Sequence, residues 1–284
     1  MKLMSFIHRE RACHGVVGNA CVFDLTPLSG RFGVDMKEFL TMNGIANLLS
    51  GGISTMPAIP LAEVIFQPVI PNPSKILCIG INYASHMKET GRELPKYPMV
   101  FTRFADSQVA HGASIIRPLV SQKLDFEGEL AVVIGRHANR VSAASALEYV
   151  AGYSCYNDGS IRDWQKHTLQ FTPGKNFPAT GGFGPWLVTA DEIADPSALH
   201  LTTRLNDHIM QDAETSDMIF SVPALIEYCS AFTALAPGDV IVTGTTGGVG
   251  AFREPPLWLK AGDTVEVEIS GIGILRNSVA DELP

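Results

Sequence analysis

Beyond residue 70 the chain alternates short apolar runs with turns that contain glycine or proline, a pattern typical of strands and not of long helices. The predicted strands are Lys75–Ile81, Leu130–Gly135, Trp186–Thr189, Leu199–Leu205, Asp239–Thr243 and Thr264–Ile269. In the last strand apolar and polar residues alternate strictly, so we expect it to be half buried, with Glu266 and Glu268 outward. The better helix candidates are Ser142–Val150 and Ile219–Phe232. The pattern as a whole predicts a β-rich α+β fold.

The first 70 residues have a different pattern and are predicted to form a small N-terminal module. Short β-like runs between Gly15 and Asp24 precede a helical stretch, rich in Met and Leu, around Met36–Leu49. The prolines at positions 68, 71 and 73 then predict a stiff connector, because each proline ring fixes φ and disfavours helix in the residue before it. We therefore expect two domains, residues 1–70 and residues 71–284.

Composition narrows the class of protein. The chain has 284 residues, 46% hydrophobic and 18% charged, which suits a globular enzyme with a sizeable core. Its net charge of −8 makes a nucleic-acid surface improbable. Five scattered cysteines without CxxC spacing favour free thiols in a reducing compartment. With no apolar run long enough for a membrane span and too short an apolar start for a signal peptide, we expect a cytoplasmic protein with no membrane partner.

Three acidic residues, Glu127, Glu129 and Asp158, lie at the ends of apolar runs and form the main chemical signal. On a strand, side chains two apart share a face, so Glu127 and Glu129 should point the same way. Adjacent carboxylates repel each other, and a divalent cation would relieve this, with Asp158 supplying a third oxygen. An all-oxygen set favours Mg²⁺, Mn²⁺ or Ca²⁺ over Zn²⁺. The spacing alone leaves a solvated acidic strand end as an equal alternative.

Four motifs carry a resemblance to a known family, and they occur in the family's order. They are Gly80–His86, Asp125–Ala131, Asn157–Asp158 with Arg162–Gln165, and Thr243–Gly250. From about Pro71 to Asp281 the chain resembles the fumarylacetoacetate hydrolase family, and in particular its acylpyruvate hydrolases. The resemblance implies a mixed β-sandwich roll, a homodimer and a Mg²⁺- or Mn²⁺-dependent enzyme acting on a small 2-oxo acid. It also implies that Glu127, Glu129 and Asp158 are the metal ligands.

Candidate catalytic residues lie in or near these motifs. If residues 82–89 are helical, His86 and Glu89 are i, i+3 neighbours, and the carboxylate would orient the imidazole as a general base. The resemblance implies that this dyad activates water, whereas a His–Glu pair is otherwise more often a surface pair. Lys175, in a Pro-Gly turn between aromatic residues, could hold a substrate carboxylate or enolate oxygen, although most loop lysines are solvated. His167 is the alternative base.

Candidate substrate-binding residues are Arg162, Gln165, Tyr83, Thr245 and Thr246. On a helical turn Arg162 and Gln165 could share a face with Asp158, with a surface salt bridge as the alternative for Arg162. The glycine-rich loop that contains the two threonines lacks dinucleotide and P-loop patterns, so we expect it to bind a small carboxylate. Related proteins usually have Pro where Thr246 stands, which leaves the shape of the loop open.

Together these features predict hydrolysis of a C–C bond in an acylpyruvate of the maleylpyruvate or fumarylpyruvate type, as in the degradation of aromatic compounds. The alternative is a decarboxylase or isomerase of a 2-oxo diacid, of the oxaloacetate or 2-hydroxyhepta-2,4-diene-1,7-dioate type. Both need a stabilised enolate, but only hydrolysis needs an attacking water. A second rival is a metal- or ligand-binding protein without turnover, against which the combined set of ligands, base and cation argues.

Overall fold

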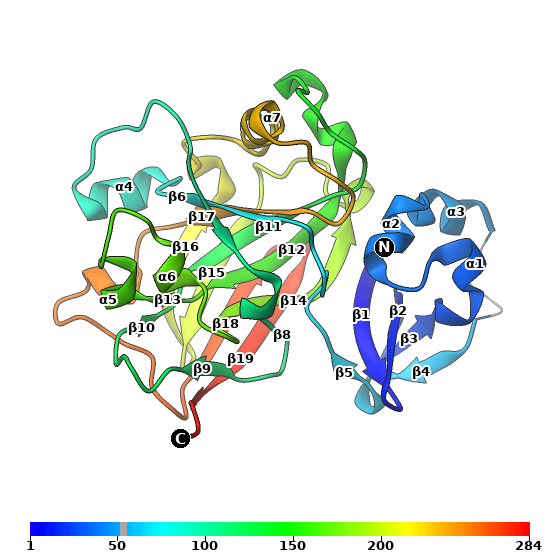
Figure 1. The fold of residues 1–284 in the computed structure, drawn as a ribbon, viewed down its shortest axis with the longest axis horizontal. Coiled ribbons are helices and arrows are strands. Elements are labelled where there is room, and N and C mark those ends of the chain that lie inside the picture. The colour runs from blue at the N-terminus through cyan, green and yellow to red at the C-terminus, as the bar shows by residue number, and fades with distance from the viewer. Residues whose placement is uncertain (52–55) are drawn as a thin grey trace.

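The computed structural model describes residues 1–51 and 56–284, arranged as a small N-terminal part beside a larger main body (Figure 1). The larger sheet runs, in spatial order, through β4 (Ala58–Pro60), β3 (Cys21–Asp24), β2 (Arg11–Val17), β1 (Lys2–His8), β14 (Gly181–Thr189), β12 (Val150–Asp158), β11 (Gly128–Ile134), β17 (Val240–Thr245), β6 (Ile76–Gly80) and β7 (Met99–Arg103). Two short strands, β5 (Ile65–Phe66) and β8 (Gln108–Ala110), pair with β1 and β14.

A second sheet packs against the main body of the first. Its spatial order is β16 (His208–Glu214), β15 (His200–Leu205), β18 (Thr264–Ile269), β19 (Gly273–Asp281) and β9 (Ile115–Arg117). A separate ribbon pairs β10 (Leu124–Asp125) with β13 (Ser160–Ile161). The α-helices are α1 (Ser29–Phe32), α2 (Met36–Thr41), α3 (Gly44–Gly51), α4 (Ala84–Thr90), α5 (Arg162–Gln165), α6 (Thr172–Lys175) and α7 (Val222–Phe232). This β-rich α+β architecture confirms the predicted fold class.

Strand β11 divides the core because alternate residues face opposite sides of the sheet. Leu130, Val132 and Ile134 pack in the cluster shared with the second sheet and α7. Ala131 and Val133 pack in the other cluster, together with side chains of the N-terminal part. Every residue of β11 is buried. A strand covered on both faces explains why its sequence is a continuous apolar run and not an alternating one.

The predicted helices differ from the observed ones in ways that have local causes. The segment Ser142–Val150 forms a 3₁₀ helix, Ala143–Tyr149, and not an α-helix. The predicted helix Ile219–Phe232 begins later, at Val222, because the N–H groups of residues 219 and 220 donate to Asn82 instead. The stretch Met36–Leu49 is split into α2 and α3, with Asn43 between them at a φ of 55°.

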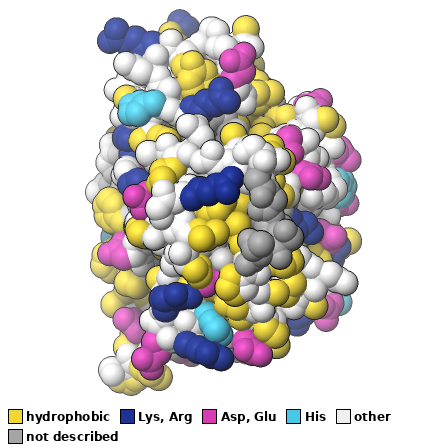
Figure 2. All heavy atoms as spheres, turned by 90° about the vertical axis from the view of Figure 1, so that its right-hand side faces the viewer, with side chains coloured by type: hydrophobic (Ala, Val, Ile, Leu, Met, Phe, Trp, Pro, Cys, Tyr) yellow, Lys and Arg dark blue, Asp and Glu magenta, His cyan; other side chains and the backbone are white. Residues whose placement is uncertain are grey.

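The N-terminal part is joined to the main body through its first strand. Strand β1, which the hydrophobic pattern did not predict, pairs antiparallel with β14, with Leu3 opposite Leu187. The larger sheet therefore continues from one part into the other, while the division at residue 70 stays a prediction. On the face that lies on the right-hand side of Figure 1, where the N-terminal part is found, hydrophobic patches alternate with both basic and acidic side chains (Figure 2). Among the described residues of the N-terminal part, Leu28, Val34, Leu49 and Ile65 are exposed.

Candidate active site

The three predicted carboxylates meet where β11 and β12 run side by side. The strands pair antiparallel with Gly128 opposite Asn157, which brings Glu127 and Asp158 together across the pair. The N–H of Asp158 donates to the backbone oxygen of Glu127 at 2.8 Å. One carboxylate oxygen from each of Glu127, Glu129 and Asp158 lies within 4.8 Å of the others, and all three residues are buried. The alternative of a solvated acidic strand end is therefore wrong.

Lys175 lies at the centre of this group and not in solvent, where most loop lysines are found. Its ammonium donates to Glu127 Oε2 and, at 2.6 Å, to Asp158 Oδ2. The side chain is 1% exposed. Burial alone would lower the pKa of Lys175, but the charges of Asp158 and Glu127 outweigh it and raise the pKa above its ordinary value. The lysine is therefore held as a cation. We call Glu127, Glu129, Asp158 and Lys175 the floor of the site.

Arg162 is placed by a buried carboxylate that sequence reasoning did not single out. Its guanidinium contacts Asp125 Oδ2 and Glu127 Oε1, each at 2.7 Å, and donates to Gln165 Oε1 at 3.0 Å. Asp125 also accepts the N–H groups of Gly250 and Ala251, at 2.8 and 3.0 Å. The proposed surface salt bridge is therefore wrong, since both charged groups are buried. Asp125 lies within a motif that was recognised, but nothing local indicated its partner.

Arg103 is a further buried cation, which no sequence pattern predicted. It ends strand β7 and donates to Asp158 Oδ1 at 2.6 Å, to Gly159 O at 3.0 Å and to Thr180 Oγ1 at 2.7 Å. Both side chains of the Arg103–Asp158 pair are fully buried. An arginine in Phe101–Phe104 belongs to no pattern that marks a site, so only the fold reveals this contact.

Glu129 is the floor carboxylate without a cationic partner among the described residues. It accepts the N–H of Gly244 at 2.5 Å. Burial, together with the charges of Asp158 and Glu127, raises the pKa of Glu129 well above its ordinary value. Burial also works to raise the pKa of Glu127, but the Arg162 and Lys175 charges lower it to about 2.

The local charge balance suits a divalent cation. The four buried carboxylates, those of Asp125, Glu127, Glu129 and Asp158, face the three buried cations of Arg103, Arg162 and Lys175, so ionisation of all four would leave one negative charge in excess, in line with the raised pKa of Glu129. An excess of buried negative charge is costly unless it is paired or coordinates a metal. Carboxylate oxygens are ligands for hard cations such as Mg²⁺ and Mn²⁺. The donor set of Glu127, Glu129 and Asp158 therefore fits such an ion.

Helix α4 brings His86 to the opposite side of the site. His86 Nδ1 lies 2.9 Å from Glu89 Oε2, the predicted i, i+3 contact. The other carboxylate oxygen, Glu89 Oε1, accepts the N–H of Gly248 at 3.0 Å, which ties α4 to the glycine-rich loop. The His86 ring is buried and meets Phe252 edge to face, with 5.9 Å between the ring centroids. The alternative, that His86 and Glu89 form an ordinary surface pair, is therefore wrong.

The hydroxyl groups of the glycine-rich loop are engaged within the protein, whereas its backbone N–H groups contact carboxylates of the site. Thr245 lines the cavity described below, but its hydroxyl donates to Gly128 O at 3.0 Å and accepts from Gln211 Nε2 at 2.7 Å. Thr246 and Tyr83 are buried, and neither is among the residues that line the cavity. Their predicted contact with substrate stays a prediction. The hydroxyl of Tyr83 has no hydrogen-bond partner among the described residues.

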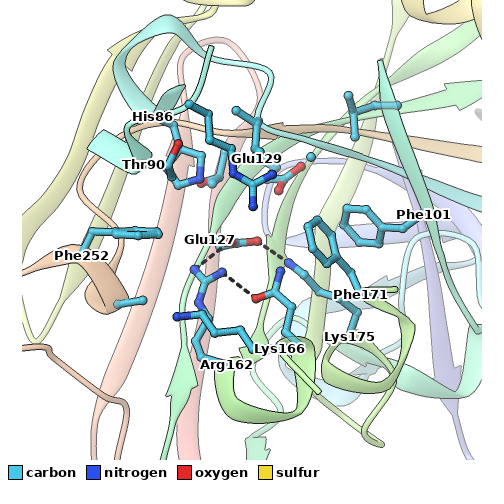
Figure 3. A pocket seen from close by; sticks show the side chains of 17 residues that line it. His86, Thr90, Phe101, Glu127, Glu129, Arg162, Lys166, Phe171, Lys175 and Phe252 are labelled. Atoms are coloured by element: carbon cyan, nitrogen blue, oxygen red, sulfur yellow. Dashed lines mark hydrogen bonds and ion pairs between the residues drawn. The ribbon is translucent and has the colours of Figure 1, made fainter. Parts of the chain in front are cut away.

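These elements enclose a cavity of about 290 Å³ above the floor. In Figure 3, His86 and Thr90 lie on one side, Arg162, Lys166 and Lys175 on the other, and Phe252, Phe101 and Phe171 form the flanking walls. We call the residues of the segments 86–92 and 165–171 that line the cavity the rim. Sequence reasoning missed the aromatic walls, which come from three separate segments. His167, the alternative base, is exposed and is not among the lining residues.

Comparison with known proteins defines the class that this fold and site represent. The family model described as "Fumarylacetoacetate (FAA) hydrolase C-terminal" matches residues 75–280. The chain is 40% identical over 262 residues to the Bos taurus protein "Oxaloacetate tautomerase FAHD2A, mitochondrial", covering 91% of this chain and 83% of that one. The chain therefore belongs to the fumarylacetoacetate hydrolase family, a family of enzymes.

Solved structures agree with this assignment. The fumarylacetoacetate hydrolase of Exiguobacterium antarcticum superimposes with a TM-score of 0.85 at 33% identity, covering 99% of this chain and 100% of that one. The maleylpyruvate hydrolase of Sphingobium sp. SYK-6, solved with manganese(II) and pyruvate, gives a TM-score of 0.84 at 26% identity, with both chains covered completely. Among the described residues, no helix is both long and apolar enough to cross a membrane. The bovine relative is named as mitochondrial, so the cytoplasmic location stays a prediction.

Proposed function

We propose that this protein is a metal-dependent isomerase that interconverts the keto and enol forms of a short 2-oxo dicarboxylate of the oxaloacetate type. The observation that carries the proposal is the buried floor with its cationic Lys175, in a chain 40% identical to a protein named oxaloacetate tautomerase. This is the alternative function derived from the sequence, and it now takes precedence over acylpyruvate hydrolysis.

Glu127, Glu129 and Asp158 would hold the Mg²⁺ or Mn²⁺ ion. When bound, such an ion acts as a Lewis acid that polarises a carbonyl oxygen and so makes an adjacent C–H group more acidic. The neighbouring cations, Arg162 and Lys175, are already neutralised in part by Glu127. They therefore position the carboxylate of the ligand and the charge of its enolate by geometry more than by excess charge.

The chain's own residues account for the proton transfer. Tautomerisation removes a proton from C3 of the substrate and adds one to the C2 oxygen, so its composition does not change. His86, oriented by Glu89 at 2.9 Å and lining the cavity, is the candidate base for C3. The Lys175 ammonium, across the cavity from His86, stabilises the negative oxygen before it is protonated (Figure 3). The aromatic walls reduce the polar surface around the reacting groups, which would strengthen both effects.

Hydrolysis of an acylpyruvate remains the second candidate because of one specific observation. The His86–Glu89 dyad has the arrangement that a base needs to activate water, and a maleylpyruvate hydrolase shares the fold over the whole chain. In this reaction His86 would take a proton from water, the hydroxide would attack the distal carbonyl, and the C–C bond would break to leave a pyruvate enolate.

A paired assay tests the two candidates. The purified protein is given the enol form of oxaloacetate and, separately, maleylpyruvate, each with and without Mg²⁺. We expect the enol absorbance of oxaloacetate to decay faster with protein and Mg²⁺, without stoichiometric release of pyruvate. Stoichiometric pyruvate from maleylpyruvate, with no effect on the enol, would establish the hydrolase instead. If neither activity is observed, the remaining candidate is a metal- or ligand-binding protein without turnover.

The partner and assembly predictions are proposals of the same kind. We propose a homodimer, to be tested by sedimentation velocity, with a small 2-oxo acid as the ligand and neither nucleic acid nor membrane as a partner.

A further inference from the structure

The cations around the cavity fall into two groups. Arg162 and Lys175 lie at its base and are paired with buried carboxylates. Arg92 and Lys166 also line the cavity, yet within residues 1–51 and 56–284 neither forms an ion pair. Both are exposed at the rim. Two cations without carboxylate partners at the mouth of a cavity with an acidic floor form a place for a second anionic group.

Local backbone structure fixes where these two cations start. Helix α4 ends at Gly91, whose φ of 65° is left-handed, and the N–H of Arg92 then donates to Met87 O at 3.3 Å. Lys166 directly follows α5, which is held at the floor by Arg162. In Figure 3 Thr90 and Lys166 lie on opposite sides of the cavity, and Arg92 follows Thr90 by two residues. The two cations that line the cavity therefore come from different segments, Arg92 from the chain after α4 and Lys166 from the chain after α5.

A second cavity lies against the first, and Arg92 belongs to both. This neighbouring cavity, of about 370 Å³, is lined by Gly80, Ile81, Arg92, Glu93, Pro95 and Met99. Gly80, Ile81 and Arg92 also line the cavity above the floor. Arg92 is the one cationic side chain among these shared residues. Its guanidinium therefore stands where a longer substrate would pass from one cavity into the next.

We propose that Arg92, together with Lys166, binds the second carboxylate of the substrate and closes the neighbouring cavity to it. A ligand whose 2-oxo acid end occupies the floor would then place its distal carboxylate at the rim, as a four-carbon diacid does. A neutral acyl group would leave Arg92 without a partner. A longer acyl group would collide with Arg92 before it reached the neighbouring cavity. The protein thereby selects short 2-oxo dicarboxylates. This inference rests on the proposed function, because it assumes that the 2-oxo acid end lies at the floor.

The test compares oxaloacetate with its 4-methyl ester, which lacks the distal charge and is larger by one methyl group. Their dissociation constants are measured by displacement of oxalate from the Mg²⁺-loaded protein, for the parent, Arg92→Gln and Lys166→Gln. Lys88→Gln, a change of an exposed lysine on α4 that does not line the cavity, is the matched control. Oxalate binding itself reports the integrity of the floor.

We expect the parent and Lys88→Gln to prefer the diacid, and Arg92→Gln to lose roughly 10- to 100-fold of that preference, the value of a charge-assisted hydrogen-bonded pair. Lys166→Gln should lose less, and oxalate binding should hold in all four proteins. Arg92→Ala should in addition bind a longer neutral acylpyruvate more tightly than the parent does. No preference in the parent, or an unchanged preference in Arg92→Gln, would overturn the inference.

Failure of the proposed function gives a different result. If the parent does not accelerate tautomerisation but Arg92→Gln still loses the preference for the diacid, the reaction assigned above is wrong and the carboxylate site stands. If tautomerisation is accelerated while the preference survives in Arg92→Gln, the reaction stands and the site assigned to Arg92 is wrong.

Discussion

At the floor of the cavity, Glu127 and Asp158 each have an arginine nitrogen within 2.7 Å, whereas at the rim Arg92 and Lys166 have no carboxylate partner among the described residues. The floor is supplied largely by the buried strands β11 and β12. The rim is supplied by the short helices α4 and α5 and the segments that follow them. The charged groups of the floor are thus paired with one another, whereas the cations of the rim are free of carboxylate partners among the described residues and can bind a ligand.

This difference assigns separate tasks to the two regions. Buried groups held by several hydrogen bonds cannot adapt to a ligand, so they suit chemistry that needs one fixed geometry. Exposed cations without carboxylate partners are available to pair with a charged group of the ligand, so they suit the selection of one ligand over another. We therefore expect changes in the floor to abolish function or folding, and changes in the rim to alter rate or selectivity.

The change Glu129→Gln should have the largest effect, because it removes one of three proposed ligands and the excess charge that favours a cation. Its Mn²⁺ affinity, measured by calorimetry, should fall by more than the roughly 10- to 100-fold that loss of an outer partner of a ligand costs. Tautomerisation should become undetectable. Glu148→Gln, at an exposed glutamate, is the control and should match the parent. Parent-like Mn²⁺ binding in Glu129→Gln would refute the metal site.

His86→Gln should lower the rate of tautomerisation by roughly 10²- to 10⁴-fold, the usual value of general acid–base catalysis. Mn²⁺ affinity should be unchanged, because His86 is not among the proposed ligands. Glu89→Gln keeps a hydrogen-bond partner at Nδ1 but loses the charge, so its loss should be smaller. A fall in Mn²⁺ affinity in His86→Gln would make the histidine a ligand, and an unchanged rate would direct attention to His167.

Arg103→Met tests whether the floor is also a structural element. Removing one partner of a buried ion pair leaves Asp158 without its arginine, which should lower the free energy of unfolding by about 3–5 kcal/mol. The matched control is Arg204→Met, which breaks a partly exposed pair with Glu268 and should cost about 0–1 kcal/mol. Urea unfolding of both variants measures the difference. Equal losses would mean that the floor pair is no more important to stability than a surface pair.

The sequence predicted the floor better than the rim, for physical reasons. The spacing of Glu127 and Glu129 on a strand is a local property, and so is the i, i+3 relation of His86 and Glu89. The contact of Arg103 with Asp158 joins residues 55 apart, and no local pattern announces it. Strand β1 was missed for the same reason, since its place depends on β14 far along the chain.

The errors within the rim and the N-terminal part have another source. Aromatic residues such as Phe101 and Phe252 look the same in sequence whether they fill a core or line a cavity, so the walls could not be distinguished. The helix expected over Met36–Leu49 is interrupted at Asn43, where the backbone turns left-handed. Asparagine tolerates that conformation. The presence of an asparagine does not by itself predict that a helix ends there. The helix preference of the residues therefore predicted one helix and not the break within it.

The N-terminal part lies outside the floor and the rim, and there we expect only a small dependence of the free energy of unfolding on pH, caused by His14. Burial lowers the pKa of His14, whose ring contacts Phe32 O at 3.0 Å, below its ordinary value. Since the unfolded chain then binds a proton more readily, stability is complete above the unfolded pKa of about 6.5 and falls as the pH drops. We expect a loss on the order of 1 kcal/mol between pH 7 and pH 5 that is absent in His14→Gln. Urea unfolding across that range measures it, and identical pH profiles would contradict the assignment.

The pairing of distant strands also sets an order of events during synthesis. Strand β11 forms a pair with β12, which follows it closely, but its other neighbour β17 begins at Val240 and pairs in turn with β6, which begins at Ile76. The N–H of Gly244 that binds Glu129 arrives with β17. At the usual speed of translation, roughly 10–30 s separate the emergence of β6 from that of β17. Until then β6 and β11 lack their common neighbour, so one edge of each of these apolar strands is unpaired. The proposed metal site therefore stays incomplete on the ribosome from the synthesis of Glu127 until Gly244 has been added.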